Sequence, residues 1–215
     1  MSELAIVRLP NGQFVQNCYL LADPATREAV IVDPGEEPRL FLDALERRRW
    51  RPTAIWLTHA HLDHIMGVEA VKRATGVPIY LHPLDRPLYE ALPAQGEWAG
   101  LALTPPPPPD AALADGQRLR VGPHEIVVRH TPGHSPGSVS FVGDDFIVGG
   151  DVLFAGSIGR TDLPGGDFNT LRASIQRVFL SRPDSTVVLS GHGPETTIGV
   201  ERLTNPFVAG GSRVG

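Results

Sequence analysis

The chain of 215 residues contains one cysteine, one lysine and no long apolar run. A lone cysteine excludes an intrachain disulfide, and Cys18 lies in the apolar run FVQNCYLL, where we expect it to pack inside a strand. No stretch approaches the roughly 20 apolar residues of a membrane-spanning helix. The start, MSELAIVRLP, lacks the basic and apolar segments of a signal peptide. We therefore expect a cytoplasmic protein without a membrane partner.

Charge is also sparse, since 20% of the residues are charged and the formal net charge is −5. Lys72 is the only lysine, and the arginines are scattered along the chain. Proteins that bind nucleic acid or anionic membranes present basic patches. The composition gives no reason to expect either partner, and its 41% hydrophobic content is ordinary for a globular protein.

Hydrophobic periodicity and turn residues predict alternating strands and helices. The predicted helices cover residues 38–49, 64–76, 83–92 and 169–180, the last with Asn169 as its N-cap. The predicted strands cover 4–9, 14–21, 28–33, 53–58, 78–81, 124–130, 137–143, 145–150 and 185–191.

The same order of strands and helices occurs twice, on either side of five consecutive prolines at 105–109. Two such halves packed sheet to sheet would form an α/β fold, a four-layer αββα sandwich. We expect one domain over 1–208 and a flexible tail over 209–215. The prolines predict an exposed, stiff connector rather than a docking motif. Whether residues 95–109, which include Trp98, cover a site as a lid is left open.

The sequence THAHLDHIMG, residues 58–67, places three histidines and an aspartate within six positions. It lies between a predicted strand and the next helix, where open α/β sheets place their sites. His59 and His61 are two residues apart and point the same way, so both reach one cation. Asp63 and His64 point away from that pair or toward a second cation. Chance occurrence of HxHxDH has odds of roughly one in a thousand, which favours a metal site.

Three more candidate ligands also follow predicted strands: His134 in TPGH, Asp151 in GGD and His192 in SGHG. Together the seven side chains suffice for two cations with an open position for water. Among the remaining histidines, His82 and His124 are expected at the surface. His130 is a candidate support for the turn that contains His134.

In order and spacing, the motifs VDPG, THAHLDH, TPGH, GGD and SGHG resemble those of the metallo-β-lactamase superfamily. The resemblance implies the αββα fold, with two divalent metal ions at one edge between the sheets. It implies that Asp33 supports the ligands without binding metal, and it implies the following ligand roles. His59, His61 and His134 bind the first ion, Asp63, His64 and His192 bind the second, and Asp151 bridges them.

Two segments, GSIGRTDLPGGD and GHGPETTIGVERLTNPF, look like those of the small glyoxalase II-like hydrolases. The resemblance implies a zinc enzyme, with iron or manganese as alternatives, that hydrolyses a small thioester or ester such as S-lactoylglutathione. Hydroxide formed between the ions would attack the carbonyl. If only one ion is bound, Asp63 is a possible acceptor of the water's proton. Full-length glyoxalase II carries a helical glutathione-binding domain after this region, whereas 23 residues follow His192 here.

Other activities of the superfamily stay open from sequence. The residues GRTD at 159–162 also resemble the persulfide dioxygenases, in which His59, His134 and Asp151 would hold a single iron. A lactone or ester hydrolase fits the same metal motif, and a non-enzymatic metal-binding role is a third class. Arg160 and Asp162 are expected to hold their own loop shut rather than to contact substrate.

Overall fold

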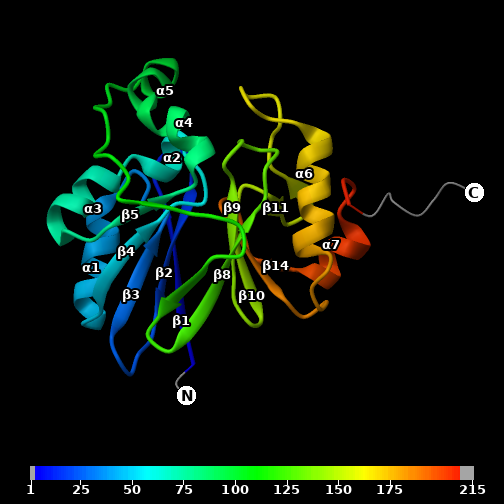
Figure 1. Cartoon of the computed structure of the whole chain (residues 1–215), viewed down its shortest axis with the longest axis horizontal. Coiled ribbons are helices and arrows are strands. Elements are labelled where there is room, and N and C mark those ends of the chain that lie inside the picture. The colour runs from blue at the N-terminus through cyan, green and yellow to red at the C-terminus, as the bar shows by residue number, and fades with distance from the viewer. Residues whose placement is uncertain (1–2, 209–215) are drawn as a thin grey trace, which may run out of the picture.

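The computed structural model describes residues 3–208, so the predicted tail at 209–215 lies outside the described residues. Two six-stranded sheets lie face to face, and helices cover their outer faces (Figure 1). This arrangement confirms the predicted four-layer αββα sandwich. Each half of the chain supplies one sheet and the helices outside it.

The first sheet has the order β1-β2-β3-β4-β5-β6. Strand β2 is antiparallel to its neighbours β1 and β3, whereas β3, β4, β5 and β6 run parallel. The strands are β1 Ala5–Asn11, β2 Gln16–Ala22, β3 Glu28–Val32, β4 Arg51–Trp56, β5 Ile79–Leu81 and β6 Ala111–Ala112.

The second sheet has the order β14-β13-β10-β9-β8-β7, and only β10 and β13 in it are parallel. A two-stranded hairpin, β11 and β12, follows β10. The strands are β7 Arg118–Val121, β8 His124–His130, β9 Val139–Val142, β10 Phe146–Gly150, β11 Leu153–Phe154, β12 Ser157–Ile158, β13 Val187–Ser190 and β14 Thr196–Thr197.

The helices are short, and none within residues 3–208 has the length and apolar character to cross a membrane. Helices α1 and α3 cover the first sheet, and α6 and α7 cover the second (Figure 1). Their bounds are α1 Pro38–Arg48, α2 Leu62–Ile65, α3 Val68–Thr75, the 3₁₀ turn η1 Pro83–Asp85, α4 Arg86–Glu90, α5 Leu92–Trp98, α6 Phe168–Ser174, the π-helical turn η2 Ile175–Phe179 and α7 Ile198–Thr204.

Strand β2 is buried on both faces and so shows how the layers join. Cys18 and Leu20 pack toward the helices of the first half, which confirms the packing role predicted for the cysteine. Tyr19 and Leu21 belong to the core between the sheets. In that core, the rings of Trp56 and Phe141 lie 5.2 Å apart. Alternation along one strand thus builds two cores, as the period of two requires.

Two details of the predicted helices are wrong. The helix predicted over 64–76 is split at Gly67, whose N–H donates to the Pro34 carbonyl 3.0 Å away. The N-cap of α6 is Asp167 rather than Asn169, because the Asp167 carboxylate accepts from the Thr170 N–H at 2.7 Å. The prolines at 105–109 have no helix or strand, as predicted, and the Tyr89 hydroxyl donates to the Pro107 carbonyl at 2.8 Å.

Candidate metal centre

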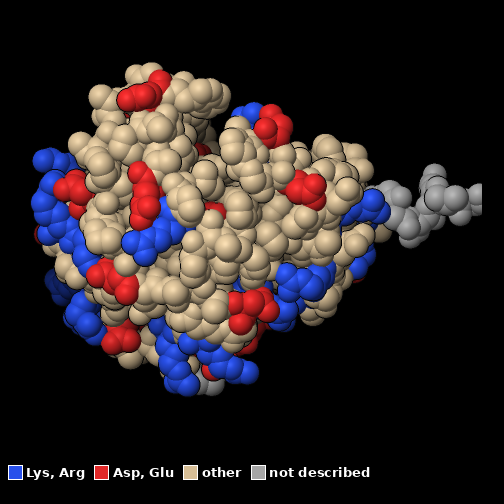
Figure 2. Space-filling model, turned by 45° about the horizontal axis from the view of Figure 1, so that its top comes forward, with Lys and Arg blue, Asp and Glu red and all other residues tan. Residues whose placement is uncertain are grey.

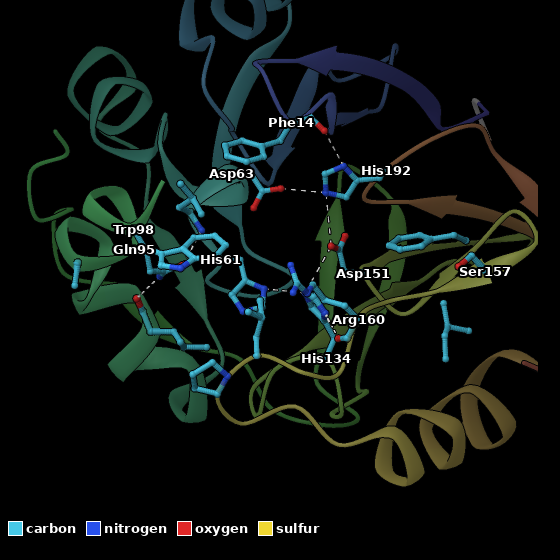
Figure 3. Close-up of a pocket in the computed structure, with 17 residues that line it drawn as sticks. Phe14, His61, Asp63, Gln95, Trp98, His134, Asp151, Ser157, Arg160 and His192 are labelled. Atoms are coloured by element: carbon cyan, nitrogen blue, oxygen red, sulfur yellow. Dashed lines mark hydrogen bonds and ion pairs between the residues drawn. The ribbon is translucent and has the colours of Figure 1, made fainter. Parts of the chain in front are cut away.

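All seven predicted ligand side chains meet at one edge of the two sheets (Figure 3 shows five of them). The loop 58–64, which follows β4 of the first sheet, supplies four of these side chains. The second sheet supplies the other three at strand ends, because His134 follows β8, Asp151 follows β10 and His192 follows β13. The two halves therefore contribute to one site, as two packed sheets with neighbouring strand ends allow.

Three histidines form the first cluster. The Nε2 atom of His134 lies 2.8 Å from Nδ1 of His61 and 3.2 Å from Nε2 of His59. All three rings are buried, and one nitrogen from each lies within 4.8 Å of the others. Imidazole nitrogens converging in this way suit borderline divalent cations.

The second cluster consists of Asp63, His64 and His192, whose potential donor atoms also lie within 4.8 Å of one another. The Asp63 carboxylate lies 3.0 Å from Nε2 of His192 and 3.6 Å from Nε2 of His64. His64 is fully buried, whereas the His192 side chain is 28% exposed and reaches the cleft.

Asp151 lies between the two clusters. One of its oxygens is 3.4 Å from Nε2 of His64, and the other is 3.5 Å from His134 and 3.6 Å from His192. Buried polar atoms normally have hydrogen-bond partners. Nε2 of His64 and Oδ1 of Asp151 have none, and both face the space between the clusters. A cation bound between the clusters would give these two atoms the partner that they lack.

The charges of the site depend on burial and on neighbouring groups. Burial, reinforced by His134, lowers the pKa of His61 to about 3, and burial also lowers the pKa of His59 well below its usual value. Both rings are therefore neutral at neutral pH, the form that binds metal. Burial would also lower the pKa of His64, but Asp63 and Asp151 outweigh it and raise that pKa. A pocket that attracts a proton so strongly also attracts a cation.

Asp33 supports His64 from behind. Its two oxygens accept from the backbone N–H of Thr58 at 2.7 Å, the hydroxyl of Thr58 at 2.6 Å and Nδ1 of His64 at 2.9 Å. Asp33 also lies close enough to His59 and His64 to form a third possible ligand group. Its hydrogen bonds occupy both oxygens, so we place it behind the ligands.

Backbone carbonyls orient two more of the histidines. Nδ1 of His134 lies 2.8 Å from the Arg160 carbonyl, and Nδ1 of His192 lies 3.1 Å from that of Phe14. The Arg160 guanidinium is paired with Asp162 through two hydrogen bonds of 2.8 and 2.7 Å. This pair lies within one loop, as predicted, and the loop holds His134 through its backbone.

Strand β2 holds the loop of His192 across the sandwich. The Asn17 backbone N–H donates to the Gly191 carbonyl at 2.7 Å, and the Asn17 side chain donates to the carbonyls of Ser190 and Gly193. The Tyr19 hydroxyl also donates to the Ser190 carbonyl, at 2.8 Å. The first half therefore positions a ligand that the second half supplies.

The other histidines lie outside both clusters. His130 and His82 stack with ring centroids 4.3 Å apart, and Nε2 of His130 lies 2.9 Å from the Pro136 carbonyl. This contact reaches the turn of His134, as we expected for His130. His82 and His124 are part-buried rather than exposed, and His124 lies 3.6 Å from Asp23.

Asp85 is a buried carboxylate that the sequence motifs did not single out. It accepts from the Ala60 N–H at 3.1 Å, between His59 and His61, and from the Ser135 hydroxyl and the Gly137 N–H at 2.7 and 2.6 Å. It thus joins the loop of His59 to the loop of His134. Asp85 lies inside the helix predicted over 83–92, where no motif indicates this role.

We expect Asp85→Ala to lower the free energy of unfolding by about 3 kcal/mol, because it leaves buried N–H groups unpaired. Asp85→Asn keeps one acceptor oxygen and is expected to lose about half as much. Urea unfolding of both variants, each with bound metal measured, tests this. An alanine variant within about 0.5 kcal/mol of the parent would contradict the role.

A cleft of about 720 Å³ opens over the clusters. Helix α5 and the turn before β2 form one side of it, and the segment 154–164 forms the other. Figure 2 shows the lobe of α4 and α5 standing beside a hollow whose surroundings are mostly uncharged. The site is therefore open to a small molecule, in the size range of ordinary ligand pockets.

The comparisons with known proteins agree with this geometry. The model of the metallo-β-lactamase superfamily matches residues 11–192. The chain is similar to the probable metallo-hydrolase YqgX of Bacillus subtilis, with 42% identity over 94% of this chain and 97% of the relative. It is also similar to hydroxyacylglutathione hydrolase GloC of Haemophilus influenzae, with 38% identity over 93% and 96%.

Two solved structures share the fold closely. The B3 metallo-β-lactamase BLEG-1 is 43% identical with a TM-score of 0.90, over 96% of this chain and all of that one. TTHA1623 in a di-iron-bound form is 44% identical with a TM-score of 0.86, over 94% and 99%. With its αββα sandwich and its histidine–aspartate metal site, this chain belongs to the metallo-β-lactamase superfamily of metallo-hydrolases.

Proposed function

We propose that the protein is a two-metal thioester hydrolase of glyoxalase II type. The observation that carries this proposal is the completeness of the second cluster. A single metal ion needs only the three histidines of the first cluster, or some of these histidines together with Asp151. Yet Asp63, His64 and His192 also converge, with donor atoms within 4.8 Å. The similarity to GloC, which extends over 96% of that protein, supports thioester chemistry in a chain of this length.

In this proposal His59, His61 and His134 hold the first ion, and Asp63, His64 and His192 hold the second. Asp151 would be shared by both ions, since one of its oxygens lies 3.4 Å from His64 and the other lies 3.5 Å from His134 and 3.6 Å from His192. The mixed nitrogen and carboxylate set fits zinc, and iron or manganese suit the same ligands. The di-iron form of TTHA1623 supports two ions and leaves their identity open.

Two bound ions would lower the pKa of a shared water and polarise the thioester carbonyl, so that attack proceeds at neutral pH. The protein's own groups orient the ligands: Asp33 fixes the ring of His64, and the Arg160 carbonyl fixes that of His134. With only one ion bound, the Asp63 carboxylate, which lies at the cleft, would be the candidate proton acceptor. A thiolate leaves without help from a general acid, so the site needs no further acidic residue.

The proposal is tested by thiol release from S-lactoylglutathione and from a simple acetyl thioester, with metal content measured on the same sample. We expect release by protein with two ions per chain and loss of release in His59→Ala, which removes a ligand of the first cluster. No release from either thioester at full metal content would overturn the thioesterase proposal. Lactones and oxygen esters would then be the next substrates.

The second candidate is a persulfide dioxygenase with one iron on His59, His134 and Asp151. The observation that favours it is the loop GRTD at 159–162, whose sequence resembles that of the persulfide dioxygenases. One iron per chain, together with oxygen consumption on a persulfide and no thioesterase activity, would establish it.

A further inference from the structure

The walls of the cleft are mostly apolar, whereas a charged substrate requires charged or polar partners. The floor consists of the ligand side chains. Nearly all the wall residues are apolar: Phe14, Leu88, Trp98, Phe154, Leu163 and Pro164. Two of them are exposed although large, since Trp98 is 75% and Phe14 37% exposed. They come from α5 and from the turn before β2, and both face the clusters (Figure 3). Exposed apolar surface around a site marks a ligand contact.

Two of the three polar side chains of the walls, those of Gln95 and Arg160, are already paired, and the third, that of Ser157, is uncharged. Gln95 accepts from the Leu62 N–H at 3.0 Å and donates to the carbonyls of Ala60 and Leu88 at 3.0 and 2.8 Å. Arg160 is the only basic side chain lining the cleft within residues 3–208, and Asp162 binds it through two hydrogen bonds. The walls therefore offer a carboxylate a single guanidinium, which is already paired with Asp162.

A glutathione group carries two carboxylates and one ammonium. Moving such charges from water to an apolar wall without partners is costly. Alkyl groups gain free energy at the same wall, by up to roughly fourfold in affinity per buried methylene. The walls of the cleft therefore favour an alkyl group over a glutathione group.

Building on the proposed thioesterase function, we propose that the substrate is a thioester whose non-reacting part is apolar, rather than a glutathione conjugate. The apolar part lies between Trp98 and Phe14 while the carbonyl faces the ligand clusters. Water adds to the thioester, and the products are the carboxylate and the free thiol. The apolar chain belongs either to the acyl group or to the thiol, and two series of substrates separate these cases.

The experiment measures kcat/KM for two series of thioesters with the metal-loaded protein. One series lengthens the acyl chain from acetyl to octanoyl on the uncharged thiol N-acetylcysteamine. The other keeps acetyl and lengthens an alkyl thiol. We expect kcat/KM to rise roughly two- to fourfold per methylene in one series and to exceed that of S-lactoylglutathione at least about tenfold. A change of less than twofold across both series would overturn the inference.

Variants locate the apolar contact. Trp98→Ala is expected to lower kcat/KM for the longest substrate about tenfold more than for the shortest one, and Phe14→Ala gives an independent second variant. Leu203→Ala is the matched control, since Leu203 is 80% exposed on α7 and does not line the cleft. A glutathione thioester that is preferred, and that loses its preference in Arg160→Ala, would overturn the inference in favour of a charged ligand.

A binding measurement separates this inference from the proposed function. Thioether analogues of both series cannot be hydrolysed, and their binding is followed by tryptophan fluorescence with Trp98→Phe as the blank. If the affinity rises with chain length but the protein cleaves no thioester, the thioesterase proposal is wrong and the inference of an apolar ligand stands. If the protein cleaves thioesters without dependence on chain length, only the inference is wrong.

Discussion

Asp151→Ala is expected to lower kcat/KM for thioester hydrolysis about a thousandfold and to reduce bound metal from two ions per chain to fewer than one. Its carboxylate is the one group that faces both clusters, with oxygens 3.4 Å from His64 and 3.5 Å from His134. Removing it leaves each cluster with three donors and no shared ligand. Metal analysis after dialysis and thiol release measure the two effects.

Asp167→Ala is the matched control for this substitution. It removes another aspartate of the second half, the N-cap of α6, whose carboxylate accepts from the Thr170 N–H. Loss of that cap is expected to cost about 1 kcal/mol of stability while metal content and activity stay unchanged. An Asp151→Ala protein that keeps both ions would show that the carboxylate does not bridge them.

The second large effect is expected for Asp33→Asn. The Thr58 backbone N–H requires an acceptor, so the amide oxygen stays there and the amide NH₂ faces Nδ1 of His64. That NH₂ forces Nδ1 to accept, which moves the ring proton to Nε2, the nitrogen that faces the second cluster. We expect the affinity for the second ion to fall about 10–100-fold and activity to fall with it.

Metal titration followed by the visible spectrum of bound cobalt measures this loss one ion at a time. The first ion is expected to bind as in the parent, because Asp33 supports His64 and not the cluster of His59, His61 and His134. Asp33→Ala serves for comparison, since it leaves the Thr58 N–H without a partner and lowers stability as well. Equal affinities in Asp33→Asn and the parent would refute the role of the carboxylate in orienting His64.

The sequence predicted the strands and the seven converging side chains because both depend on local patterns. The apolar run in β2 and the run VGG before Asp151 are visible without tertiary information. The first glycine of SGHG, Gly191, is required at its position, because a Cβ there would lie 2.1 Å from Asp151 and 2.8 Å from His64. That motif therefore reflects the close packing of the site.

What the sequence did not predict depends on contacts between distant segments. The break between α2 and α3 occurs where Gly67 packs on Pro34 and Gly35, and a Cβ there would lie 2.2 Å from the Gly35 carbonyl. Strand β7 was not predicted, nor were the two-residue strands β6, β11, β12 and β14, which are too short to show a period. Asp85 acts through two loops that are far apart in sequence, so no local motif contains it.

The hydrogen bonds between β2 and the loop of His192 have a consequence for how the protein matures in the cell. A ribosome delivers residues 16–22 long before residues 190–193, so Asn17 and Tyr19 lack these partners until the later residues have been made. Domains fold as units, and contacts this distant in sequence form late. His59 and His61 therefore emerge long before the seven side chains can converge, which requires residue 192.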